Sequence, residues 1–232
     1  MRFLDGPNGF AQGAIVSAHE EQTLIANYFG GEKGYFVEVG AYDPVYQSQS
    51  YHLELAGWDG VLIEPVPDLA DNLARARRAM VHRCACVSPG QDSAGTVPLL
   101  ERRGGSTIVF NPKAVGEDMV LDVPAKTLDT VLQEAGAPRI DFLSVDVEGA
   151  EPDVLSGLSF SKYKPRLVLV DDRERFGETC RLLRRNGYQL VRRSGHNGWF
   201  VPRDARFPIT LEGRLRLVWT YGLGRTIRRL RR

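Results

Sequence analysis

Two expected strands end in residues whose types and spacing could do chemistry. Gly40 follows the apolar run 35–39, and Glu64 closes the apolar run 60–64, 24 residues after that glycine. A glycine at a strand end permits a tight turn and lets a ligand approach the backbone closely. An acidic side chain at about this distance can accept hydrogen bonds from both hydroxyls of a ribose. Together the two features predict a nucleoside at the carboxyl edge of a sheet.

The residues around Gly40 restrict which nucleoside could bind. The chain continues with Ala41, Tyr42 and Asp43, which departs from the G-x-G-x-x-G pattern that cradles a pyrophosphate. Glu38 and Asp43 lie on either side of the glycine, and their negative charge repels phosphate but suits an ammonium group. The loop therefore fits a nucleoside with an amino-acid tail better than a dinucleotide.

A second set of carboxylates follows two later strands. Asp146 and Glu148 follow the fourth expected strand, and Asp171 and Asp172 follow the fifth. Neighbouring parallel strands end at the same edge of a sheet, so these side chains should meet at one mouth. Carboxylates that close together need a proton or a cation between them. The sequence therefore predicts that Asp146 or Glu148 acts as a general base, or that a divalent cation such as Mg²⁺ binds there.

The carboxylates and the histidines leave alternatives open. Asp171 and Asp172 could instead be solvated, or pair with the neighbouring Arg173 and Arg175. His196, in an expected hairpin turn, is a second candidate for the base. The other histidines, which we expect to be structural, are His19, His52 and His82.

These residues can act together only if a sheet brings the strand ends to one edge. The sequence has the alternating pattern of strands and helices that predicts such a sheet. Helical and strand periods alternate from about residue 17 to residue 201. Such alternation favours right-handed crossovers and a mainly parallel sheet. We expect a Rossmann-like α/β fold whose mainly parallel, seven-stranded sheet closes with an antiparallel C-terminal hairpin. The strands are expected over 35–39, 60–64, 81–87, 140–145, 166–170, 188–192 and 199–201.

Two further segments are expected beside this sheet. Ser17 and Glu20 form a capping box, which predicts an N-terminal helix over about 17–30. The least regular part of the chain is about 88–125. A connection of that length predicts a lid or substrate loop, or conceals a short hairpin.

Several stretches of the sequence resemble the FkbM-type methyltransferase family. The resemblance spans roughly residues 17–201 and is most specific in two blocks, one around Gly40 and Glu64 and one around Asp146. The family usually has Ser-Asn-Thr where this chain has Ser48, Gln49 and Ser50. The stretches that carry the resemblance are 34–44, 48–50, 57–65, 140–151 and 154–157.

The resemblance implies a class I S-adenosylmethionine fold that methylates hydroxyl groups of sugars, glycolipids or secondary metabolites. It places the methionine end of the cofactor near Glu38, Gly40 and Asp43, the ribose on Glu64, and adenine near Cys86 and Val87. The full set of cofactor residues expected is Glu38, Gly40, Ala41, Asp43, Ser48, Glu64, Pro65, Cys86, Val87 and Asp146. Asp146, Asp171 and Asp172 also resemble the metal triad of magnesium-dependent O-methyltransferases.

The C-terminal stretch differs from the rest of the chain. Residues 203–232 carry nine Arg against Asp204 and Glu212, and apolar side chains are interspersed among them. We therefore expect a methyltransferase domain over 1–202 and a basic amphipathic tail over 203–232. Such a tail could dock on the acidic body, associate with a second subunit, or lie on an anionic membrane surface. Nucleic acid is disfavoured as a partner because the sequence has no recognisable binding motif.

Composition sets the remaining limits. A net charge of +1 over 232 residues gives the whole chain no bias toward nucleic acid. Cys84, Cys86 and Cys180 are too few and too oddly numbered for a disulfide framework. The N-terminus lacks the apolar core of a signal peptide, and no apolar run approaches the ~20 residues that cross a bilayer. We therefore expect a cytoplasmic protein.

Two other functions compete with methyl transfer. An NAD-dependent oxidoreductase would use the same Glu64 but needs a glycine loop that tolerates phosphate, and residues 41–43 argue against that. A non-catalytic nucleoside-binding module on the same fold would lack the carboxylates after the fourth and fifth strands. This chain keeps them.

Overall fold

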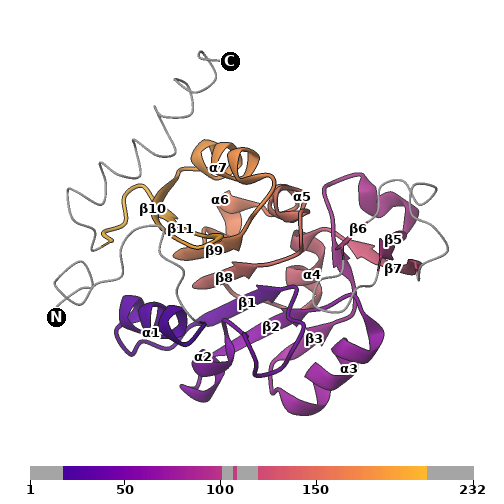
Figure 1. Cartoon of the computed structure of the whole chain (residues 1–232), viewed down its shortest axis with the longest axis horizontal. Coiled ribbons are helices and arrows are strands. Elements are labelled where there is room, and N and C mark those ends of the chain that lie inside the picture. Colours follow the sequence, from indigo (N-terminus) through magenta and orange to yellow (C-terminus); the bar gives the residue numbers. More distant parts are fainter. Residues whose placement is uncertain (1–17, 101–106, 109–119, 208–232) are drawn as a thin grey trace.

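The fold is built around one twisted sheet whose strand order reverses beside its first strand. The computed structural model of the protein describes residues 18–100, 107–108 and 120–207. The sheet has seven strands in the order β10-β11-β9-β8-β1-β2-β3 (Figure 1). The strands are β1 (Tyr35–Val39), β2 (Asp59–Ile63), β3 (Met80–His82), β8 (Phe142–Val145), β9 (Leu167–Asp171), β10 (Tyr188–Ser194) and β11 (Asn197–Pro202).

The pairing of these strands confirms the expected fold class. Every neighbouring pair from β9 to β3 is parallel, whereas β11 runs antiparallel to both β9 and β10. The chain moves outward from β1 to β3 and then returns to the other side of β1 to form β8 and β9. A crevice for ligands is therefore expected at the carboxyl ends of β1 and β8, where the direction changes.

Helices cover both faces of the sheet, because alternate side chains of its strands are apolar on both sides. Ile25, Leu53 and Leu73, from three different helices, pack with Phe36 and Leu62 on one face. The first three helices lie together on that side in Figure 1 and are α1 (Ala18–Phe29), α2 (Tyr51–Leu55) and α3 (Pro67–Ala76). The other face packs against α4 (Leu128–Glu134), α5 (Glu151–Ser156), α6 (Phe160–Tyr163) and α7 (Phe176–Arg185).

The expected third strand, 81–87, is wrong as a single element. The first strand of this segment, β3, ends at His82. The next strand, β4 (Ala85–Cys86), belongs to a second sheet of order β4-β7-β5-β6. The other members of that sheet are β5 (Thr96–Leu100), β6 (Thr107–Ile108) and β7 (Val120–Lys126), and the short helix η1 (Gln91–Ala94) precedes them. The region over about 88–125 therefore contains antiparallel pairs, as the alternative of a concealed short hairpin predicted, since β5 pairs with β7 and with β6.

The expected N-terminal helix forms as α1, while Ser17 of its capping box lies outside the described residues. Most of the expected basic tail, from residue 208 on, also lies outside them. None of the helices in the described ranges is both long and apolar enough to span a membrane.

Gly40 permits the closest backbone approach at the crevice. Its φ is +80°, and a β-carbon built on it would overlap the carbonyl oxygen of Asp146. The Gly40 N–H donates to the Ile63 carbonyl (2.9 Å), and the Asp146 N–H donates to the Val39 carbonyl (3.0 Å). The ends of β1, β2 and β8 are thus tied together around a residue without a side chain.

Gly40→Ala should lower the free energy of unfolding for two reasons: alanine is strained at a positive φ, and its β-carbon would overlap the backbone of Asp146. Gly136→Ala is the matched control, because Gly136 also has positive φ (+62°) but has no atom within 4 Å of an added β-carbon. We expect the control to cost about 1–2 kcal/mol and Gly40→Ala to cost about 1–3 kcal/mol more from overpacking. Urea unfolding measures both values, and equal losses in the two variants would contradict the close approach.

Candidate active site

A cavity of about 480 Å³ opens at the carboxyl ends of β1, β2, β8 and β9. Residues of the second sheet, Ala85, Cys86 and Leu99, form part of its wall. Most of the residues expected from the sequence meet there. Those lining the cavity are Glu38, Gly40, Ala41, Glu64, Pro65, Cys86, Asp146, Glu148 and Asp171.

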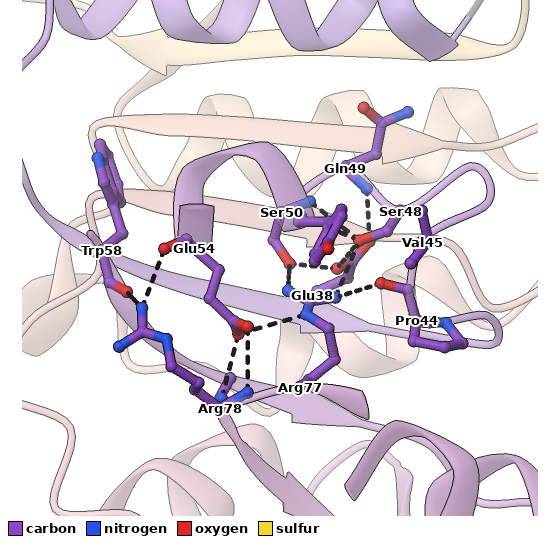
Figure 2. Close-up of polar contacts among 12 residues, drawn as sticks. Glu38, Pro44, Val45, Ser48, Gln49, Ser50, Glu54, Trp58, Arg77 and Arg78 are labelled. Atoms are coloured by element: carbon purple, nitrogen blue, oxygen red, sulfur yellow. Dashed lines mark hydrogen bonds and ion pairs between the residues drawn. The ribbon is translucent and has the colours of Figure 1, made fainter. Parts of the chain in front are cut away.

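Glu38 is buried beneath the β1–α2 loop (residues 40–50) and holds it in place (Figure 2). Its carboxylate accepts hydrogen bonds from the hydroxyls of Ser48 (2.9 Å) and Ser50 (2.5 Å) and from the Gln49 N–H (2.7 Å). Burial raises the pKa of Glu38, whereas these bonds and the charge of Arg77 act in the opposite direction. Glu38 therefore organises the loop, with most of its hydrogen-bonding capacity already used.

Two loop residues expected to face the cofactor have structural partners instead. The Ser48 hydroxyl turns to Glu38, and Ser48 does not line the cavity. Asp43 also lies outside the lining, because its carboxylate accepts the N–H groups of Val45 (2.9 Å) and Tyr46 (2.6 Å). Ser48 and Asp43 therefore shape the loop, and neither side chain borders the cavity. Val87, expected near adenine, likewise lies outside the lining, although Cys86 next to it is part of the wall.

Glu64 is fixed at the end of β2 by the backbone on both sides of it. One carboxylate oxygen accepts the Tyr42 N–H (3.0 Å), and the other accepts the Val66 N–H (2.9 Å). The side chain is only 4% exposed, and burial raises its pKa against the effect of these two bonds. Each oxygen retains a lone pair, so Glu64 can still accept hydrogen bonds from two donors in the cavity.

Asp146 faces the cavity and has acidic neighbours. Asp146 is exposed within the open cavity, yet the protein groups around it reduce its hydration and raise its pKa to about 8, and the negative charges of Asp171 and Glu148 add to the shift. Arg173 acts in the opposite direction and lies 3.7 Å from Asp171 as an ion pair. Since its pKa is close to physiological pH, Asp146 can change protonation state during a reaction.

Asp172 does not join these carboxylates, so the expected metal triad is corrected. Its side chain is fully buried, and its oxygens accept the Arg175 N–H (2.7 Å) and the Thr179 hydroxyl at the start of α7. Asp146 and Asp171 line the cavity without it. Within the described ranges, no three His, Cys, Asp or Glu side chains gather closely enough to hold a metal ion.

His196 does not line the cavity, so the structure offers no support for its role as a base. It is exposed in the turn between β10 and β11, and its carbonyl accepts the Asp172 N–H (3.3 Å). The residue following it, Asn197, lines the cavity instead.

Sequence reasoning missed a cluster around Glu21 of α1. Its carboxylate is 3% exposed, lines the cavity, and accepts hydrogen bonds from Ser194 (2.7 Å), Asn197 (2.8 Å) and Gln49 (3.0 Å). Burial raises the pKa of Glu21. Ser194 and Asn197 lie 173 and 176 residues further along the chain, so no local pattern connects them with Glu21.

Comparisons with known proteins identify one matching family. The family model described as the methyltransferase FkbM domain matches residues 38–190. A crystal structure of the methyltransferase FkbM from Methylobacillus flagellatus KT is 18% identical, with a TM-score of 0.47. The alignment covers 72% of this chain and 43% of that one, so the chain spans less than half the length of that protein. No curated protein matches the sequence.

The family model spans well over half of the chain, including the end of β1, all of β2, β8 and β9, and the ends of these strands that line the cavity. The protein therefore belongs to the FkbM methyltransferase family.

Proposed function

We propose that the protein is an S-adenosylmethionine-dependent O-methyltransferase that acts on a hydroxyl of a sugar, a glycolipid or a secondary metabolite. One observation carries the proposal: a single cavity contains both a carboxylate suited to a ribose, Glu64, and a carboxylate suited to proton transfer, Asp146. They lie at the ends of β2 and β8, on the two sides of β1.

The cavity suits this cofactor in size and in chemistry. Its volume lies within the range of about 300–1,000 Å³ typical of small-molecule sites. Glu64 can accept from both ribose hydroxyls, and the apolar side chains of Ile63, Leu69 and Leu99 offer a surface for a flat base. When bound, S-adenosylmethionine supplies a methyl group on a positively charged sulfur.

The chain's own contribution to the reaction is to align the acceptor and remove its proton. Asp146, in its ionised form, would accept the proton of the acceptor hydroxyl as that oxygen bonds to the methyl carbon; the methyl–sulfur bond would break, with S-adenosylhomocysteine as the leaving group. Neighbouring Asp171 and Glu148 raise the proton affinity of Asp146, which strengthens it as a base.

The charge of the cavity also argues against the NAD-dependent alternative. Among the described residues that line the cavity, Arg173 supplies the one guanidinium, whereas six carboxylates are present. A pyrophosphate would be repelled, and a ligand with a net positive charge would be favoured. The carboxylates are those of Glu21, Glu38, Glu64, Asp146, Glu148 and Asp171.

Glu64→Gln should weaken the binding of S-adenosylmethionine by about tenfold or more, because one acceptor oxygen and the charge are lost. Calorimetry with S-adenosylmethionine measures the change. Glu134→Gln is the control, since Glu134 is exposed on α4 and forms its ion pair with Lys126. Absence of binding to the wild-type protein would overturn the proposed function, and full affinity in Glu64→Gln would exclude this role of Glu64.

Binding of S-adenosylmethionine should tighten as the pH rises through about 8. Asp146 is mostly neutral below its raised pKa and negatively charged above it, and only the charged form attracts the positive sulfur. Calorimetry between pH 6.5 and pH 9 should show an increase in affinity of about tenfold. S-Adenosylhomocysteine, whose sulfur is neutral, should show a smaller change.

Asp146→Asn is the matched variant for this pH dependence. It keeps the size of the side chain and removes the titrating group, so the two ligands should then depend on pH alike. A pH profile for S-adenosylmethionine that is the same in Asp146→Asn and in the wild type would contradict the assignment.

A further inference from the structure

A buried arginine outside the cavity is bonded to the loop that forms one of its walls. We propose that Arg77 is a positioning residue that fixes the β1–α2 loop in the shape required to bind the cofactor. The inference rests on the proposed function, because it assigns this loop to S-adenosylmethionine. Arg77 itself does not line the cavity.

Arg77 reaches the loop from the end of α3. It is the C-cap residue directly after α3, and its side chain is fully buried. Nη1 donates to the carbonyl of Pro44 (3.1 Å) and to the Ser48 hydroxyl (3.2 Å), and Nη2 donates to the Ser50 hydroxyl (3.0 Å). Figure 2 shows these contacts converging on the loop from one guanidinium. One side chain therefore holds three positions of the loop.

The two serine hydroxyls connect Arg77 to Glu38. Each hydroxyl has a single hydrogen, and in both Ser48 and Ser50 that hydrogen is donated to Glu38. The hydroxyl oxygens accept from Arg77, and that of Ser48 also accepts the Tyr51 N–H (3.1 Å). The order of donation, from guanidinium to hydroxyl to carboxylate, fixes the orientation of both serines.

The charges around Arg77 make it difficult to replace. Glu54 of α2 lies 3.3 Å from Nε of Arg77 as an ion pair. The guanidinium of Arg77 therefore lies between the carboxylates of Glu54 and Glu38. The guanidinium also lies over the rings of Phe36 (5.9 Å) and Tyr51 (5.2 Å). Loss of Arg77 would leave buried carboxylates without a compensating charge.

The same network extends to the cavity. The Gln49 N–H donates to Glu38, and the Gln49 side chain lines the cavity together with Gln47 and Tyr46. The segment held by Arg77, 44–50, therefore contains cavity-lining residues between its fixed points. Movement of this segment would change the wall without altering Glu64 or Asp146.

The test compares Arg77 with the arginine that follows it. Arg78 is exposed and donates to the carbonyls of Glu54 (2.9 Å) and Trp58 (3.5 Å), with no bond to the loop. Arg77→Met should weaken S-adenosylmethionine binding, measured by calorimetry, by about tenfold or more. Arg77→Lys, which keeps the charge but loses the planar fork, should lie between Arg77→Met and wild type. Arg78→Met should bind within about twofold of wild type.

Amide hydrogen exchange without ligand separates positioning from a general loss of stability. In Arg77→Met, or in Arg77→Lys if the first variant does not fold, the N–H groups of Gln49 and Ser50 should exchange faster. Those of β1 report any loss of global stability, so the acceleration at Gln49 and Ser50 should exceed the acceleration in β1. Global destabilisation alone would not accelerate Gln49 and Ser50 more than β1.

Two results would overturn the inference. One is affinity within twofold of wild type in folded Arg77 variants, and the other is equal weakening by the Arg77 and Arg78 substitutions. A wild-type protein that does not bind S-adenosylmethionine would instead overturn the proposed function, and the cofactor role of Arg77 with it.

Discussion

The reversal of strand order beside β1 is the constraint on which the rest of the structure depends. Because β2 and β8 lie on opposite sides of β1, the residues that follow these three strands meet although they are far apart in the sequence. The meeting requires a residue without a side chain at the end of β1, since the backbone of Asp146 occupies the space beside Gly40. Glu64 and Asp146 then border the same cavity.

The cavity concentrates negative charge, and the fold compensates for it in different ways at different carboxylates. Glu38 and Glu64 are held by hydrogen bonds from nearby backbone and hydroxyl groups. Asp171 has Arg173 as an ion-pair partner, whereas Asp146 is surrounded mainly by acidic neighbours. Reduced hydration, together with these negative charges, raises the proton affinity of Asp146. A positively charged ligand would reduce the repulsion among these carboxylates. This reduction is the physical reason for proposing S-adenosylmethionine as the cofactor.

The residues at the strand ends were predictable because the apolar runs in the sequence show where each buried strand ends. Gly40, Glu64 and Asp146 each follow an apolar run, and parallel pairing brings such positions to one edge. The metal triad was wrong at Asp172 because adjacent residues in a strand point to opposite sides. Asp171 lines the cavity, and Asp172 turns away to the first turn of α7. Glu21 could not be found, since its partners follow it by more than 170 residues.

The boundaries of the family match divide the cavity wall into two parts. Glu38, Glu64 and Asp146, which we assign to the cofactor and to proton transfer, all lie within residues 38–190. Glu21 precedes that range and Asn197 follows it, yet both line the cavity and are bonded to each other. Gln49 of the β1–α2 loop is bonded to the same carboxylate, so this loop joins the two parts. A change at Glu21 or Asn197 can therefore reshape the wall without altering the strand ends that hold Glu64 and Asp146.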